Sequence, residues 1–69
     1  MRITFHQKLI INKLRAAQRR LTTRQVAQNT GLAWMTVRHN LVSLLEGGYV
    51  RNEILSNRTY WWLNPEKSV

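Results

Sequence analysis

The stretch that most constrains this chain runs from Leu21 to Val50, LTTRQVAQNTGLAWMTVRHNLVSLLEGGYV. Apolar residues recur in it at intervals of three and four, which is the spacing of one face of a helix. Gly31 interrupts this pattern, and glycine enters the left-handed turn that ends many helices at little cost. Gly47-Gly48 stops the second periodic segment. The stretch therefore predicts two short helices joined by a tight turn and followed by an extended segment.

A further helix is predicted before this stretch. Thr4 and Gln7 have the spacing of a capping box, so the helix should begin after Thr4 and run to about Arg19. One apolar stripe is expected to face the core, and it consists of Ile10, Leu14 and Ala17. A polar and basic stripe falls on roughly the opposite side, and it consists of Lys8, Asn12, Arg15 and Arg19.

A second, smaller apolar patch on the same helix consists of Phe5, Leu9 and Ala16. Two interpretations of this patch remain open. It packs under the C-terminal tail, or it forms a homodimer contact, because contiguous exposed apolar surface usually has a partner.

The helix after Leu21 should start at Thr22, which has capping-box spacing to Gln25, and end near Thr30. The following helix is predicted over residues 34–46. Its buried stripe is Val37, Leu41 and Leu44, and its outward residues are Met35, His39, Val42 and Glu46, with Arg38 on one flank. Trp34, at the start of this helix, is interpreted as a packing anchor against the preceding helix in preference to a base-stacking platform.

The segment YVRNEILSNRTYWWLN predicts a β-hairpin with Ser56-Asn57 as a two-residue turn. With this turn, each residue of one strand pairs with the residue of the other strand whose number sums with its own to 113. The face assigned to the core then carries Val50, Asn52, Ile54, Thr59, Trp61 and Leu63. Trp62 would point outward beside Arg51. It then covers the arginine stem in a cation–π contact, stacks on a partner, or turns inward if the register differs. A short third strand is expected near Leu21, and Asn64 to Val69 are expected to form a frayed tail.

The charge of the chain is concentrated in its helical part. Residues 1–45 contain eight Lys or Arg and no Asp or Glu, whereas residues 46–69 balance three basic residues against three Glu, so the net charge of +8 belongs to the first part. Repulsion among so many positive charges destabilises a compact domain, so a polyanionic partner is favoured. Nucleic acid is favoured over an anionic membrane, because a membrane-binding helix needs a continuous exposed apolar face.

Length and composition limit the remaining possibilities. Sixty-nine residues predict a single domain over residues 1–69, with a core of about 4–64 and a tail of 65–69. Cysteine is missing, two His and three Glu suggest no metal set or nucleophile–base pair, and no Gly-rich phosphate loop occurs. We therefore expect no enzyme activity, metal, cofactor or small-molecule effector. No apolar run reaches the roughly 18 residues of a membrane span, so a cytoplasmic or nucleoid location is expected, or the host cytoplasm if the protein is viral.

The pattern from Leu21 to Val50, followed by an aromatic hairpin, resembles the winged-helix family of DNA-binding domains over residues 9–64. The residues that carry the resemblance are Thr22, Val26-Ala27, Thr30-Gly31-Leu32, Thr36-Val37, Leu41, Leu44 to Val50 and Tyr60 to Leu63. Ala33 departs from the pattern, because regulators of this kind often have a Ser there that caps the next helix. The resemblance implies an α+β fold in which three helices precede a hairpin wing.

The resemblance also implies a mode of binding to double-stranded DNA. The helix over 34–46 would lie in the major groove, with Met35, Arg38 and His39 nearest the bases. Phosphates would be contacted from the start of the preceding helix and from nearby positions, by Thr22, Thr23, Arg24, Thr36, Arg19 and Arg20. Asn57 and Arg58 at the wing tip would reach a minor groove or a phosphate.

A small transcription regulator of prokaryotic, phage or archaeal-virus type is the leading hypothesis. The alternatives are a non-specific, architectural or replication-linked DNA binder, and a winged helix used for protein contact.

Overall fold

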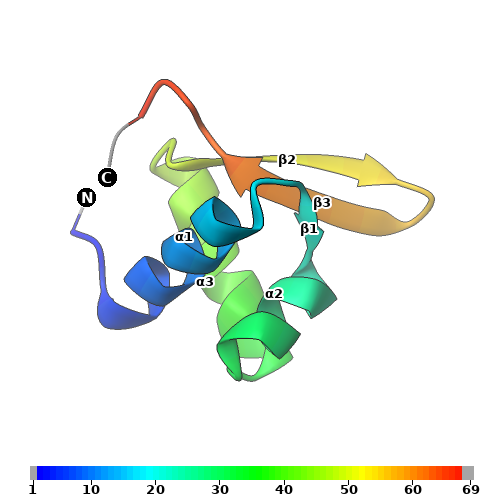
Figure 1. Cartoon of the computed structure of the whole chain (residues 1–69), viewed down its shortest axis with the longest axis horizontal. Helices are drawn as coiled ribbons and strands as arrows, with labels where there is room; N and C mark the ends of the chain where they lie inside the picture. Colours follow the sequence, from blue (N-terminus) through cyan, green and yellow to red (C-terminus); the bar gives the residue numbers. More distant parts are fainter. Residues whose placement is uncertain (1, 68–69) are drawn as a thin grey trace.

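The computed structural model describes residues 2–67, in which three helices precede a β-hairpin that projects to one side (Figure 1). The elements in chain order are α1 (Phe5–Ala17), β1 (Leu21–Thr22), α2 (Thr23–Thr30), α3 (Trp34–Glu46), β2 (Val50–Leu55) and β3 (Arg58–Leu63). The strands form one antiparallel sheet in the order β1-β3-β2. The predicted α+β winged helix-turn-helix architecture is confirmed, including the short third strand at Leu21. No helix within residues 2–67 is long and apolar enough to cross a membrane.

Both predicted capping boxes are present. The Thr4 hydroxyl accepts a hydrogen bond from the Gln7 backbone N–H at 3.2 Å, and the Gln7 side chain accepts one from the Thr4 N–H at 3.0 Å. Thr22 and Gln25 repeat this exchange at the start of α2, at 3.1 and 2.9 Å. Each box satisfies two backbone donors that a helix start leaves without partners.

The end of α1 differs from the prediction. The helix stops at Ala17, not near Arg19, because Gln18 adopts the left-handed conformation with φ 53° and its N–H bonds to the Leu14 carbonyl. Gly31 ends α2 in the same conformation with φ 74°, as its position in the sequence predicted. Trp34 begins α3 at the predicted residue.

The register of the hairpin is the one predicted. Val50 pairs with Leu63 and Leu55 with Arg58, and Ser56 and Asn57 turn between them with φ of 49° and 65°. These positive angles match the twist of a tight two-residue hairpin.

The core-facing side of the hairpin is shorter than predicted. Trp61 is only 2% exposed, whereas Ile54, assigned to the same face, is 69% exposed. The hairpin extends beyond the helices that would cover Ile54 (Figure 1). Only the half of this face nearest the helices therefore joins the core.

Trp62 points outward, but the expected contact with Arg51 is wrong. The guanidinium of Arg20 lies over the Trp62 ring at 4.0 Å from its centroid, and Arg20 also pairs with Glu53 at 2.5 Å. Arg51 is opposite Trp62 in the register but lies 3.7 Å from Glu66. Arg20 lies in the loop before β1. The spacing of residues within the hairpin could not indicate this contact, because Arg20 is not part of the hairpin.

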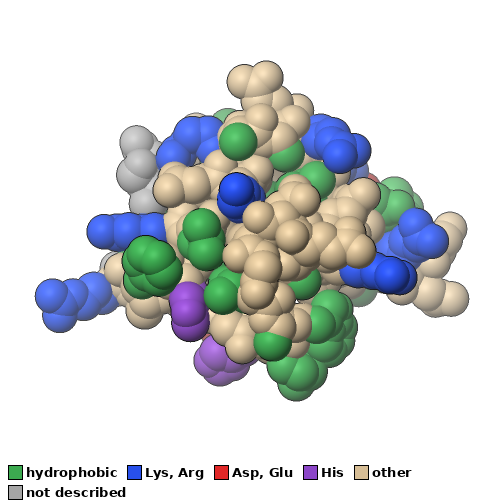
Figure 2. Space-filling view, turned by 60° about the horizontal axis from the view of Figure 1, so that its bottom comes forward, with side chains coloured by type: hydrophobic (Ala, Val, Ile, Leu, Met, Phe, Trp, Pro, Cys, Tyr) green, Lys and Arg blue, Asp and Glu red, His purple; other side chains and the backbone are tan. Residues whose placement is uncertain are grey.

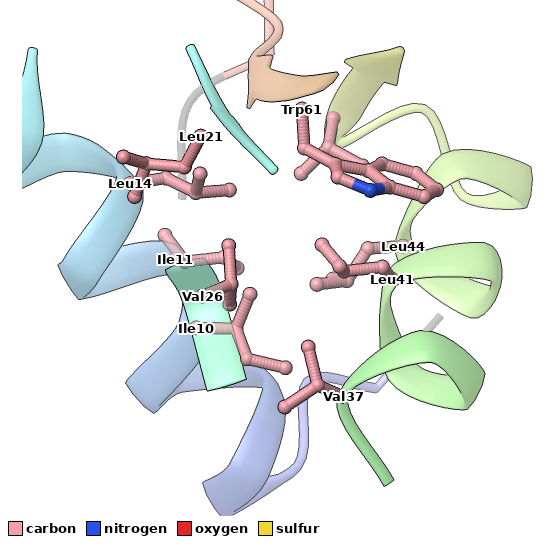
Figure 3. Packing of buried hydrophobic residues seen from close by; sticks show 10 residues of the cluster. Ile10, Ile11, Leu14, Leu21, Val26, Val37, Leu41, Leu44 and Trp61 are labelled. Atoms are coloured by element: carbon pink, nitrogen blue, oxygen red, sulfur yellow. The ribbon is translucent and has the colours of Figure 1, made fainter. Parts of the chain in front are cut away.

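Buried side chains from all three helices and the sheet meet in one core. It comprises Ile10, Ile11, Leu14, Leu21, Val26, Val37, Leu41, Leu44, Val50 and Trp61. Figure 3 shows Ile10 and Val37 pointing toward each other from α1 and α3. The apolar stripe of α1 was predicted imperfectly, because Gln7 and Ile11 are buried as well and Ala17 is only half-buried. α1 packs against α2, α3 and β3, so its buried arc is wider than one stripe.

The C-terminal tail is ordered as far as Lys67, so the prediction that it is frayed is wrong for this part. The Asn64 side chain donates to the Gly48 carbonyl at 2.8 Å, and Lys67 Nζ donates to the Gly47 carbonyl at 2.6 Å. Lys67 also lies 4.4 Å from the centroid of the Tyr49 ring. Residues 68 and 69 of the predicted tail lie outside the described residues.

Candidate nucleic-acid interface

A groove of about 420 Å³ lies between the N-terminal ends of α2 and α3 and the tip of the hairpin. Its lining residues come from three segments that are separate in the sequence. They are Thr22, Thr23, Arg24 and Gln25 from β1 and the start of α2, Trp34 and Arg38 from α3, and Asn57, Arg58 and Thr59 from the hairpin. The turn at Gly31 and the hairpin register together bring these residues to one face.

A hydrogen bond between two elements fixes the back of the groove. Trp61 Nε1 donates to Thr23 Oγ1 at 2.8 Å, which ties β3 to the first turn of α2. The Trp61 ring is buried in the core, and its neighbour in the register on β1 is Leu21. The hairpin and α2 are therefore positioned by the core itself, and the groove does not depend on loops alone.

The groove has the composition of an anion-binding surface. Three guanidinium groups, those of Arg24, Arg38 and Arg58, line it, and no acidic side chain is among its described lining residues. Thr22, Thr23 and Thr59 contribute hydroxyls, and Arg38 also lies 5.9 Å from the Trp34 ring centroid. Guanidinium groups and hydroxyls are the donors that most often contact DNA phosphates and base edges.

The exposed face of α3 continues from the groove. Met35 is 66% exposed, and Arg38 and His39 are exposed as well, whereas Thr36 is half-buried and its carbonyl accepts a hydrogen bond from Asn40. Figure 2, with the bottom of Figure 1 turned forward, shows Lys and Arg around the rim of this face, His and hydrophobic side chains on it, and almost no acidic atoms. The buried stripe of Val37, Leu41 and Leu44 is as predicted, and it leaves this face free.

The structure separates the predicted site residues into two groups. Arg38 lies in the groove together with Thr22, Thr23, Arg24, Asn57 and Arg58, and Met35, Thr36 and His39 lie on the adjoining surface of α3. Arg19 and Arg20 line a different groove, of about 380 Å³, beside Trp62. Any phosphate contact of these two arginines would therefore lie apart from the α3 groove, and Arg20 is also held by Glu53 and Trp62.

Trp34 was interpreted as a packing residue, but the structure places it in the groove. Its side chain is 48% exposed and it lines the groove beside Arg38. Its position at the first residue of α3 carried the relevant signal, because the first turn of a helix entering a groove lies closest to the ligand. Gln25 and Thr59 are lining residues that sequence reasoning did not single out as site residues.

Comparison with known proteins assigns the family. Residues 9–53 match the IclR helix-turn-helix domain, a match that covers α2, the turn, α3 and most of β2. The chain belongs to the IclR helix-turn-helix domain family. The predicted winged helix-turn-helix family is thereby confirmed, and DNA binding is the function that this domain family and the similar Mb0332 DNA-binding domain support.

Several solved structures resemble this IclR-type domain. The homodimeric winged helix-turn-helix DNA-binding domain of Mb0332 from Mycobacterium bovis, a possible ArsR-family regulator, is 28% identical with a TM-score of 0.74, over 87% of this chain and 55% of that chain. The Zα domain of PKZ from Carassius auratus, solved in complex with Z-DNA, is 26% identical with a TM-score of 0.74, over 84% of this chain and 90% of that chain.

The PcaV transcriptional regulator from Streptomyces coelicolor, solved with its natural ligand, has a TM-score of 0.82 at 24% identity, over 91% of this chain and 46% of that chain. At this identity the likeness concerns the fold alone. The chain thus spans about half of the PcaV chain and about half of the solved Mb0332 fragment. A search of curated proteins found no match.

Proposed function

We propose that this protein is a transcription regulator that binds double-stranded DNA with α3 in the major groove. The observation that carries the proposal is the groove between α2, α3 and the hairpin, where Arg24, Arg38 and Arg58 converge from three elements. A duplex offers one phosphate charge per roughly 1.7 Å of helix axis, so separated cations on one face suit it better than they suit a small anion. Because the proposed ligand is DNA, the protein would act in the cytoplasm or the nucleoid.

In this proposal, one set of residues contacts base edges, and a second set contacts phosphates and so positions the protein on the duplex. Arg38, on the flank of α3 beside the groove, is the candidate for a bidentate contact to guanine, with Met35 and His39 next to it on the exposed face. A second set would hold the sugar-phosphate backbone from the start of α2 and from α3, and it consists of Thr22, Thr23, Arg24 and Thr36. Asn57 and Arg58 at the hairpin tip would reach the adjacent minor groove or a phosphate.

Selection of binding sites from a random duplex pool tests this function. A regulator should bind its selected site about 10³-fold or more tightly than random duplex at physiological salt. A ratio near one would replace the regulator with a non-specific or architectural DNA binder. Failure to bind any duplex at low salt would instead favour a winged helix that contacts protein, because phosphate contacts strengthen steeply as salt falls. A left-handed duplex belongs in the same comparison, since the similar Zα domain was solved with Z-DNA.

We also propose that the protein is a homodimer through the apolar patch of α1, which consists of Phe5, Leu9 and Ala16. Phe5 is 78% exposed, so the alternative in which the C-terminal tail covers it is wrong for the described residues. The contacts of Lys67 at the end of the tail are with Gly47 and Tyr49. A large exposed aromatic beside half-buried Leu9 is the kind of surface that a second copy covers, and the similar Mb0332 domain is homodimeric.

A further inference from the structure

Large hydrophobic side chains are exposed on α3, although this helix is proposed to meet a charged polymer. Trp34, Met35 and Val42 are three of the six large hydrophobic side chains that are exposed among the described residues. Met35 is 66% exposed and Val42 39%, and neither belongs to the buried cluster or to the half-buried residues packed against it. Packing of the core therefore does not explain Met35 and Val42.

Helical spacing places these two side chains around the proposed base-reading residues. Met35 precedes Arg38 by three residues and His39 by four. Val42 follows Arg38 by four residues and His39 by three, and residues at such spacings are neighbours on a helix surface. The four exposed side chains form one patch, about 10 Å long at about 1.5 Å per residue, with an apolar group before and after the two polar ones. We call these four residues the α3 patch.

The α3 patch continues the arginine-lined groove, because Arg38 belongs to both. Arg24 and Arg58 are the other guanidinium groups of the groove, and its described lining residues include no acidic side chain. A partner that covers the α3 patch must therefore also accept several cations. Duplex DNA meets both conditions, since phosphates surround a major groove whose floor consists of base edges.

The base edges of the major groove offer one apolar group to such a patch. They present hydrogen-bond acceptors and amino groups, together with the methyl group at C5 of thymine. 5-Methylcytosine carries the same methyl group at the same ring position. The side chains of Met35 and Val42 have no hydrogen-bond donor, so they gain from a base edge mainly by covering apolar surface. With base pairs about 3.4 Å apart, the length of the patch corresponds to about three base pairs.

We propose that Met35 and Val42 read the C5 methyl groups of pyrimidines on either side of the base pair contacted by Arg38. This inference rests on the proposed function, because it needs α3 in the major groove. Arg38 would contact the acceptors of guanine, and each apolar side chain would cover one methyl group. The selected DNA site should accordingly contain a thymine within about two base pairs of that guanine on each side.

Replacing single thymines by deoxyuridine in the selected duplex tests the inference. This exchange removes the C5 methyl group and leaves the hydrogen-bonding groups of the base unchanged. The wild type should bind about fourfold more weakly when either of two thymines is replaced, because burying one methyl-sized apolar group contributes about that factor. The other thymines should have no measurable effect.

Two results with the wild type separate failure of the inference from failure of the proposed function. A wild type that prefers its selected site but binds every uridine-substituted duplex equally well would overturn the inference and leave the proposed function standing. A wild type that binds no duplex, or binds selected and random duplex alike, would refute the regulator itself.

The variants Met35→Ala and Val42→Ala assign each methyl contact. Each variant should lose the preference for thymine over uridine at one of the two positions and keep it at the other. The ratio of two affinities measured with one protein does not depend on the fraction of molecules that are folded, so a loss of stability cannot imitate this result. A variant that weakens both duplexes by the same factor would show that its side chain does not contact the methyl group.

Ile54→Ala is the matched control. Ile54 is exposed to a similar degree as Met35, at 69%, but it lies on β2 and is not among the lining residues of the groove. This variant should keep both fourfold preferences. Loss of either preference in Ile54→Ala would argue against the assignment to α3.

Cytosine and 5-methylcytosine at the same two positions distinguish the possible sources of the methyl group. Tighter binding of thymine than of 5-methylcytosine would identify unmodified DNA as the target, and the reverse order would identify methylated DNA. In both cases 5-methylcytosine should bind more tightly than cytosine. Equal binding of these two bases would contradict the proposal that the methyl group itself is read.

Discussion

At the scale of single residues, the structure gives several side chains two tasks. Thr23 lines the recognition groove and also accepts the hydrogen bond of the buried Trp61 indole. Arg20, which looked like a phosphate contact in the sequence, instead links the loop before β1 to both hairpin strands through Trp62 and Glu53. The residues that shape this site are therefore partly the residues that hold the hairpin on the helices.

Replacing Thr23 tests the link between hairpin and helix. Thr23→Val removes the acceptor of the 2.8 Å bond from Trp61 Nε1, and leaving a buried donor without a partner costs about 1–3 kcal/mol. In a domain of this size each kcal/mol lowers the melting temperature by about 4–8 °C. Thermal unfolding without DNA measures the effect. Thr23→Ser keeps the hydroxyl, so an equal loss in both variants would argue against the hydrogen bond as the cause.

Arg38 and Arg24 lie in the same groove but should behave differently in DNA binding. Arg38→Ala should lower affinity for the selected site by about 1–3 kcal/mol and relax specificity at one or two base pairs. Arg24→Ala should weaken all duplexes alike and reduce the salt slope by about one. Titrations of selected and random duplex at several salt concentrations distinguish the two. Equal effects of Arg38→Ala on both duplexes would remove its base-reading role.

At the scale of elements, local signals determine where most helices begin and end. Thr4 and Thr22 cap α1 and α2 through side-chain hydrogen bonds, and Gly31 turns the chain into α3. The start of α3 is the exception, because Ala33 occupies the N-cap with φ −61° and ψ 145° but has no side-chain oxygen. The helix proposed to enter DNA is thus the one whose first turn is held least firmly by its own sequence.

Supplying the missing cap should stabilise the domain. Ala33→Ser places a hydroxyl where it can accept from a free backbone N–H of α3, which is worth about 1 kcal/mol. We expect a rise in melting temperature of about 4–8 °C. Gln28→Ser, at an exposed position inside α2, is the control and should lower stability slightly, since serine is a poorer helix former than glutamine. No difference between the two variants would show that another group already satisfies the start of α3.

At the scale of the whole molecule, the recognition groove and the apolar patch of α1 consist of different residues. The recognition groove is lined by three arginines from α2, α3 and the hairpin, whereas Phe5 exposes a large apolar side chain at the N-terminal end of α1. No residue of the apolar patch of Phe5, Leu9 and Ala16 is among the described lining residues of the groove, so the proposed dimer contact can be altered without changing a groove residue.

Sedimentation without DNA tests the dimer. The parent should sediment as a dimer at micromolar concentration and Leu9→Lys as a monomer, because a buried unpaired ammonium is costly at an apolar contact. Ile54→Lys places the same charge at the exposed hairpin tip and should leave the dimer intact. A parent that is monomeric throughout this range would rule out the homodimer.

Local sequence signals were sufficient for the starts of the three helices and for the hairpin register, but not for the end of α1. Capping pairs, Gly31, the stripe of Val37, Leu41 and Leu44, and the turn at Ser56-Asn57 each depend on neighbours within a few residues, and all are confirmed. The groove residues Arg24, Arg38 and Arg58 were also named from the sequence, because the resemblance to a known fold supplied their positions.

Tertiary structure decided which side chains meet across long separations in the chain. Arg20 over Trp62, Trp61 bonded to Thr23, the exposure of Ile54 and the order of the tail up to Lys67 all depend on which element lies opposite. The separation of Arg19 and Arg20 from the α3 groove has the same origin. Periodicity within one helix or strand gives the direction of a side chain relative to its own axis, but only packing between elements gives its partner.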